Sequence, residues 1–125
     1  MKLGTFLTIK AIVCFFFAVA MLLLPATFVS SMGGTASPDT ILFARTVGAC
    51  FVGIGLICWF AKNAAHSDLR QGILLALFCA DTIGFVVSLL AQLAAVTNAL
   101  GWIDVAIWLF LAAGLGYFRF LKPAD

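Results

Sequence analysis

Asp81 is the most deeply placed charged side chain in this sequence, because it lies inside the long apolar segment of residues 72–96. It follows Arg70 by eleven residues. In a helix that rises ~1.5 Å per residue this corresponds to ~16 Å, about half the thickness of a ~30 Å hydrocarbon layer. An aspartate at that depth costs about 2.5–3.5 kcal/mol on insertion scales. Its side chain is therefore expected to face other helices or a water-filled cavity.

Two kinds of chemistry are open to Asp81. In the first, its carboxyl group is protonated and bonded to a backbone carbonyl or to the hydroxyl of Thr82 or Thr46, because a low dielectric disfavours a carboxylate unless a cation lies near. Replacement by Asn is then expected to be nearly harmless. In the second, Asp81 carries protons or a cation, and the same replacement abolishes transport because an amide cannot titrate. The first interpretation is favoured, since no second acid lies in this segment.

A second polar group is predicted near the other end of the helices. Arg45 and Asp104 each lie about four residues inside an apolar segment, a depth of ~6 Å below the same interface, and Gln92 is at a similar depth. A charge-assisted Arg45–Asp104 pair, completed by Gln92 and Asn98, would make both charges tolerable. The alternative is that each side chain reaches the headgroups separately. Matched depths and opposite signs favour the pair, which could bind a polar or anionic ligand or fix the helix register.

Small residues recur at every fourth position of the segment 72–96, and we call them the small-residue ridge: Gly72, Ala76, Ala80, Gly84 and Ser88. This spacing keeps them on one side of a helix, where another helix backbone can approach closely. In lipid, such close packing drives helix association, because burial from water cannot. We therefore predict a close helix contact along the ridge, with the partner in the same chain or in another copy.

The other reactive residue types form no catalytic pattern. The four cysteines lie in apolar segments without a C-x-x-C pair for thiol exchange, so we interpret them as small hydrophobic side chains. His66 is the sole histidine and has no companion ligands in its link. All five acids are aspartates, which excludes the helix-borne glutamates of four-helix di-iron sites. The sequence therefore predicts no enzyme activity, no metal and no cofactor.

Four apolar segments of membrane-spanning length carry these residues: 9–29, 41–61, 72–96 and 100–120. With 65% hydrophobic and 10% charged residues, the chain has too few polar side chains to cover a water-soluble globule. Short links make consecutive helices antiparallel neighbours. The predicted fold is all-α, with residues 1–125 forming one domain, an antiparallel bundle of four transmembrane helices. Its expected partners are the lipid bilayer and other membrane helices, and not nucleic acid, because the net charge of +2 is modest.

Proline and serine residues predict where helices begin and end. Pro25 can kink or terminate the first helix. Ser37 and Pro38 form a predicted N-cap and first helical position, and Ser67 is a predicted cap for the third segment.

The basic residues predict the orientation. Six of the seven fall at the termini or around the link between the second and third segments: Lys2, Lys10, Lys62, Arg70, Arg119 and Lys122. Lys10 is expected to snorkel from the end of the first segment. The two opposite links carry no Lys or Arg, so both termini are predicted to face the cytoplasm. In an alternative interpretation residues 11–24 belong to a cleaved signal peptide, but this apolar stretch is long for that role.

Short motifs add a family resemblance. The chain has Ala-Arg-x-x-Gly at residues 44–48 and Gly-x-Gly-Leu at residues 53–56; Gly101-Trp102 opens the last helix and Gly116-Tyr117-Phe118 closes it. In these features it resembles DoxX-like and related families of small bacterial four-helix membrane proteins. The resemblance implies a bacterial inner-membrane protein without an assigned catalytic activity, so no catalytic residue is transferred.

Two functions follow as expectations. The first is a non-enzymatic membrane protein that acts through helix packing, as a homo-oligomer or as an accessory subunit of a larger membrane complex. The second is a small proton-coupled carrier that uses Asp81 together with the Arg45 and Asp104 region. The surroundings of Asp81 distinguish them, because a water-accessible cavity favours the carrier and dry packing favours the subunit.

Overall fold

The computed structural model describes residues 1–122, which form helices joined by short links and contain no strand. A short helix, α2 (Pro25–Ser31), follows the first long helix. The predicted all-α class is therefore confirmed for this range. The long helices are α1 (Leu3–Leu23), α3 (Pro38–Ala61), α4 (Asp68–Leu93) and α5 (Gly101–Gly116), which continues as a π-helical turn, η1 (Tyr117–Leu121).

The predicted capping signals set several helix ends. Leu24 leaves the helical conformation at φ −129° and ψ 50°, and Pro25 opens α2 at its first position. The Ser37 hydroxyl accepts a hydrogen bond from the Thr40 amide at 3.2 Å, and the Ser37 amide donates to Thr40 Oγ1 at 2.8 Å, which completes a capping box for α3. The Ser67 hydroxyl accepts from the Arg70 amide at 3.2 Å and caps α4.

Four helices are long and apolar enough to cross a membrane: Leu3–Leu23, Pro38–Ala61, Asp68–Leu93 and Gly101–Leu121. The last three begin and end within four residues of the predicted segments. The first was expected at residues 9–29 and lies six residues earlier, so that prediction is wrong. Proline lacks the amide needed to continue a helix, and its ring clashes with the preceding turn. Helix α1 therefore ends before Pro25 and reaches back to Leu3.

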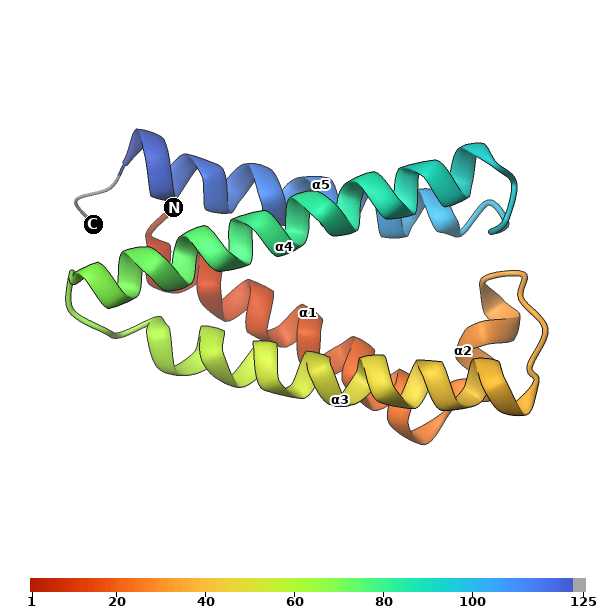
Figure 1. The fold of residues 1–125 in the computed structure, drawn as a ribbon. Coiled ribbons are helices and arrows are strands. Elements are labelled where there is room, and N and C mark those ends of the chain that lie inside the picture. Colours follow the sequence, from red (N-terminus) through yellow and green to blue (C-terminus); the bar gives the residue numbers. More distant parts are fainter. Residues whose placement is uncertain (123–125) are drawn as a thin grey trace.

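The long helices pack as two pairs (Figure 1). Helix α1 lies along α3, and α4 lies along α5; the two pairs meet each other chiefly through side chains. Met1, η1 and the α3–α4 link lie at one end of the molecule, which we call the proximal end. Helix α2 and the α4–α5 link lie at the opposite end, the distal end.

The two helix pairs are joined differently at the two ends. In the proximal half, buried side chains from all four long helices and η1 form one hydrophobic core. At the distal end the links meet through hydrogen bonds: the Asn98 amide donates to the Met32 carbonyl at 3.0 Å, and Asn98 Nδ2 donates to the Ser31 carbonyl at 2.8 Å. The core residues are Leu3, Phe6, Leu7, Ala11, Cys58, Ala61, Leu74, Leu77, Leu111, Leu115 and Phe118.

Large apolar side chains cover the outer surface of the long helices. Phe16 of α1, Phe43 of α3, Leu90 of α4 and Phe110 of α5 are examples, and each is more than half exposed. Soluble monomers rarely expose apolar surface so extensively, whereas the surface of a membrane protein that faces lipid must be apolar. This surface and the four spans agree with a membrane protein.

Candidate functional site

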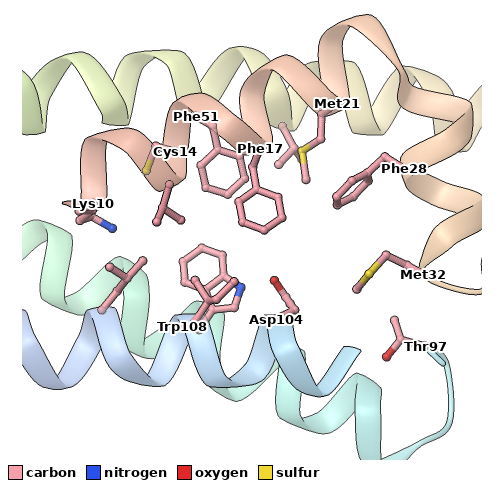
Figure 2. A pocket seen from close by; sticks show the side chains of 14 residues that line it. Lys10, Cys14, Phe17, Met21, Phe28, Met32, Phe51, Thr97, Asp104 and Trp108 are labelled. Atoms are coloured by element: carbon pink, nitrogen blue, oxygen red, sulfur yellow. The ribbon is translucent and has the colours of Figure 1, made fainter. Parts of the chain in front are cut away.

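A chamber of about 310 Å³ lies between the helix pairs in the distal half of the interior (Figure 2). Its walls are apolar and largely aromatic, with Phe17 from α1, Phe51 from α3 and Trp108 from α5. Lys10 borders the proximal end of the chamber, and Asp104 lies toward its distal end. Charged side chains therefore lie at the proximal end and in the distal part of a largely apolar space.

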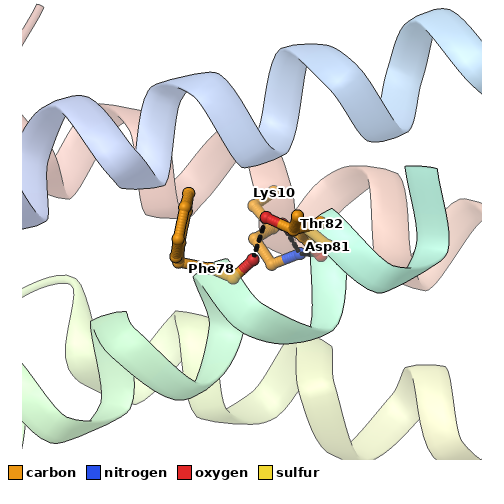
Figure 3. A network of polar contacts seen from close by, with 4 residues as sticks. All are labelled: Lys10, Phe78, Asp81 and Thr82. Atoms are coloured by element: carbon orange, nitrogen blue, oxygen red, sulfur yellow. Dashed lines mark hydrogen bonds and ion pairs between the residues drawn. The ribbon is translucent and has the colours of Figure 1, made fainter. Parts of the chain in front are cut away.

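Lys10 of α1 and Asp81 of α4 form a buried ion pair at the proximal end of the chamber (Figure 3). Lys10 Nζ donates to Asp81 Oδ1 at 2.7 Å and to Oδ2 at 2.8 Å, and each residue is only 2% exposed. A buried charge is tolerated when an opposite charge and hydrogen bonds replace its lost water. The ion pair meets this requirement, and it connects one helix pair to the other.

The position of Lys10 corrects the expectation that it snorkels at an interface. Because α1 begins at Leu3, Lys10 lies seven residues inside the helix, or ~10 Å along its axis. A protonated Asp81 was expected only if no cation lay near it. Lys10 is such a cation. The two hydroxyls expected to bind Asp81 are bonded within their own helices, Thr82 to the Phe78 carbonyl at 2.8 Å and Thr46 to the Leu42 carbonyl at 2.9 Å.

A sequence signal for this ion pair existed. Pro25 marks the start of a new helix, and a span counted back from it places Lys10 well inside the first helix. Two opposite charges at depth within two apolar segments then suggest a pair. The prediction missed the pair because the first span was extended past Pro25.

Arg45, Asp104 and Gln92 are not brought together. Asp104 Oδ2 accepts a hydrogen bond from the Ser88 hydroxyl at 2.7 Å, whereas Arg45 is exposed and forms no ion pair within the described residues. Gln92 instead serves the α4–α5 link, where its Oε1 accepts from Thr97 Oγ1 at 2.6 Å and its Nε2 donates to the Asn98 carbonyl at 3.1 Å. Equal depth did not imply contact, because Arg45 belongs to one helix pair and Asp104 to the other.

The distal half of the small-residue ridge packs against α5. A Cβ atom at Gly84 would lie 2.5 Å from Cε3 of Trp108, so only glycine admits this indole. Ser88 bonds Asp104, as described above. The ridge therefore sets the spacing of α4 and α5 at these two positions.

The proximal half of the ridge is exposed. Gly72, Ala76 and Ala80 lie on the open side of α4, and no atom approaches within 4 Å of a Cβ built on Gly72. Ala76 and Ala80 border a cavity of about 190 Å³, which Ile54 and Ile57 of α3 line on the other side. Close helix packing at this half of the ridge is not supplied by the described part of the chain.

The remaining reactive side chains are dispersed. Within residues 1–122 no group of three or more His, Cys, Asp or Glu side chains is placed to hold a metal ion. All four cysteines are free thiols, with Cys14 and Cys58 buried and Cys50 and Cys79 exposed. His66 is exposed in the α3–α4 link.

The chain matches no protein-family model, no curated protein and no solved structure. The similarity to DoxX-like families therefore stays a prediction from the short motifs. The function must be inferred from the geometry of the described residues.

Proposed function

We propose that the chain is an integral membrane protein whose four long helices cross the bilayer as an antiparallel bundle with both termini in the cytoplasm. The apolar outer surface supports a lipid environment, and the charge asymmetry supports the orientation. After Lys10 is reassigned to the interior, five basic residues still lie at the proximal end and none in the distal links. The five are Lys2, Lys62, Arg70, Arg119 and Lys122.

The proximal aromatic and basic residues also suit an interface. Lys62 Nζ lies 3.1 Å from the ring centroid of Trp59, at the end of α3. Tryptophan and lysine are enriched where a helix meets the headgroups. The resemblance to DoxX-like families makes a bacterial inner membrane the proposed location.

The proposed function is non-enzymatic and acts through helix packing, either between copies of this chain or with a larger membrane complex. The observation that carries this proposal is the exposed half of the ridge at Gly72, Ala76 and Ala80. In lipid, small residues at four-residue spacing are favourable where a second backbone approaches and bring no benefit where lipid alone covers them. The adjoining cavity, which Ile54 and Ile57 line on the α3 side, would let a partner helix contact both α3 and α4.

The test is a bulky substitution on the exposed ridge. Ala80→Leu should remove the association, while Val86→Leu, which adds bulk on another exposed face of α4, should leave it intact. The assembly mass is measured by light scattering in mild detergent, and co-purifying chains are identified by mass spectrometry. A wild-type complex of several copies supports the homo-oligomer, and a co-purified chain lost from Ala80→Leu supports the accessory subunit. A monomeric wild type without co-purifying chains, or equal assembly of both variants, contradicts the proposal.

A proton-coupled carrier is the second candidate. Its support is the chamber, which has Lys10 of the ion pair at one end and Asp104 in its distal part. Arg45 does not line the chamber, so the carrier proposal depends on Asp81 and Asp104. Proton flux in proteoliposomes tests it: a carrier should lose flux in Asp104→Asn at unchanged thermal stability. Wild-type flux equal to that of protein-free vesicles contradicts it.

A further inference from the structure

The chamber combines a carboxylate with aromatic walls, a combination that the packing function does not use. The Ser88 hydroxyl occupies Asp104 Oδ2, and no described residue donates to Oδ1. Lys10 cannot balance this charge, because both oxygens of Asp81 hold its ammonium group. Because the charges of Lys10 and Asp81 cancel each other, an ionised Asp104 gives the chamber one uncompensated negative charge.

Aromatic rings form a continuous series along the chamber. The ring centroids of Phe17 and Phe51 are 6.3 Å apart, and those of Phe51 and Trp108 are 6.1 Å apart. Phe28 extends the series toward the distal end, 6.1 Å from Phe17. Aromatic faces attract cations electrostatically, most strongly where water is excluded. The aromatic walls therefore favour a cation, as an ionised Asp104 does.

Another cavity, of about 450 Å³, adjoins the chamber on the side of the molecule. It lies between α1–α2 and α5, and it shares Phe17, Phe28 and Asp104 with the chamber. At its rim, Phe16 is 67% exposed and Ile103 is 57% exposed, so the rim faces hydrocarbon in the proposed membrane. At the distal end, the hydrogen bonds of Asn98 join the α4–α5 link to the end of α2. A ligand would thus enter sideways from the lipid.

We infer that the chamber binds a lipid-soluble organic amine with a single positive charge, whose ammonium group bonds Asp104 and whose apolar body packs against Phe17, Phe51 and Trp108. A volume of about 310 Å³ accommodates a small aromatic body. The charge of the ligand complements Asp104, and its solubility in lipid matches the lateral entrance. This site goes beyond the proposed packing function, because it lies within one chain and needs no second copy.

The test uses two probes of nearly equal shape, 1-naphthylmethylamine and its neutral analogue 1-naphthylmethanol. Binding to the purified protein in lipid nanodiscs is measured by equilibrium dialysis, with empty nanodiscs as the reference for partition into lipid. The amine should bind wild type more tightly than the alcohol. Asp104→Asn should weaken amine binding about tenfold or more, the range of a lost charge-assisted hydrogen bond, and leave the alcohol unchanged.

A second variant keeps the inference testable if Asp104→Asn fails to fold. Phe51→Leu retains an apolar wall but removes an aromatic face, and it should weaken amine binding about threefold to thirtyfold with less effect on the alcohol. Amine binding that Asp104→Asn, or in its place Phe51→Leu, leaves unchanged overturns the inference, as does equal binding of amine and alcohol to wild type. These measurements do not depend on assembly mass, so they can fail while the packing proposal holds.

Discussion

Replacing Asp81 with Asn leaves the Lys10 ammonium group buried without a carboxylate. The ion pair has Nζ–O distances of 2.7 and 2.8 Å, and both residues are 2% exposed, so water can replace little of the lost interaction. Breaking a buried pair by removing one partner costs about 3–5 kcal/mol in the free energy of unfolding. We expect Asp81→Asn and Lys10→Met to approach that loss. The sequence alone predicted a nearly harmless Asp81→Asn, and the presence of Lys10 reverses that expectation.

The double variant separates the ion pair from simple loss of packing. Lys10→Met with Asp81→Asn removes both charges together, so it should be less destabilised than the sum of the single variants. A coupling free energy of roughly 0.5–3 kcal/mol is expected for groups in contact. Asp39→Asn is the matched control, because Asp39 is exposed in the first turn of α3 and its loss should cost less than about 1 kcal/mol.

The assay is reversible unfolding in mixed micelles, followed by circular dichroism while the fraction of denaturing detergent is raised. All variants are compared with wild type at one pH and one ionic strength. If the single losses add in the double variant, or if Asp81→Asn is as stable as Asp39→Asn, then Lys10 and Asp81 do not stabilise each other.

Two further outcomes are expected. Gly84→Leu should destabilise the α4–α5 packing by about 1–3 kcal/mol, the usual cost of overpacking, because it drives a side chain into Trp108. Val86→Leu should be neutral in the same detergent-unfolding assay, since Val86 is exposed, and equal effects of the two would refute the contact. Reporter fusions after the last residue and within residues 31–37 should report opposite sides of the membrane. The same side for both would refute the four-span topology.

Local signals predicted the elements well because they act within a few residues. Ser37 and Ser67 cap the helices that they were expected to cap, and Pro25 terminates α1. Apolar length predicted four spans because hydrocarbon thickness fixes how many residues a helix needs. Only the first span was misplaced, by crossing Pro25.

The pairing of polar groups could not be predicted in the same way. Depth along a helix follows from counting residues, but contact also requires two helices to be neighbours and to turn the right faces together. Arg45 and Asp104 matched in depth yet belong to different helix pairs. The small-residue ridge showed which side of α4 permits close approach, and it did not show that α5 covers only the part at Gly84 and Ser88.

The distance between Lys10 and Asp81 in a lipid bilayer is the most direct test of the buried ion pair. Solid-state NMR of protein labelled with 15N at Lys10 Nζ and 13C at Asp81 Cγ measures their dipolar coupling, with Lys10→Met assigning the lysine signal. A coupling of contact strength is expected from the Nζ–O distances of 2.7 and 2.8 Å, together with an ammonium group that is protected from water. Absence of measurable coupling, together with a Lys10 ammonium group in rapid exchange with bulk water, would contradict the buried ion pair.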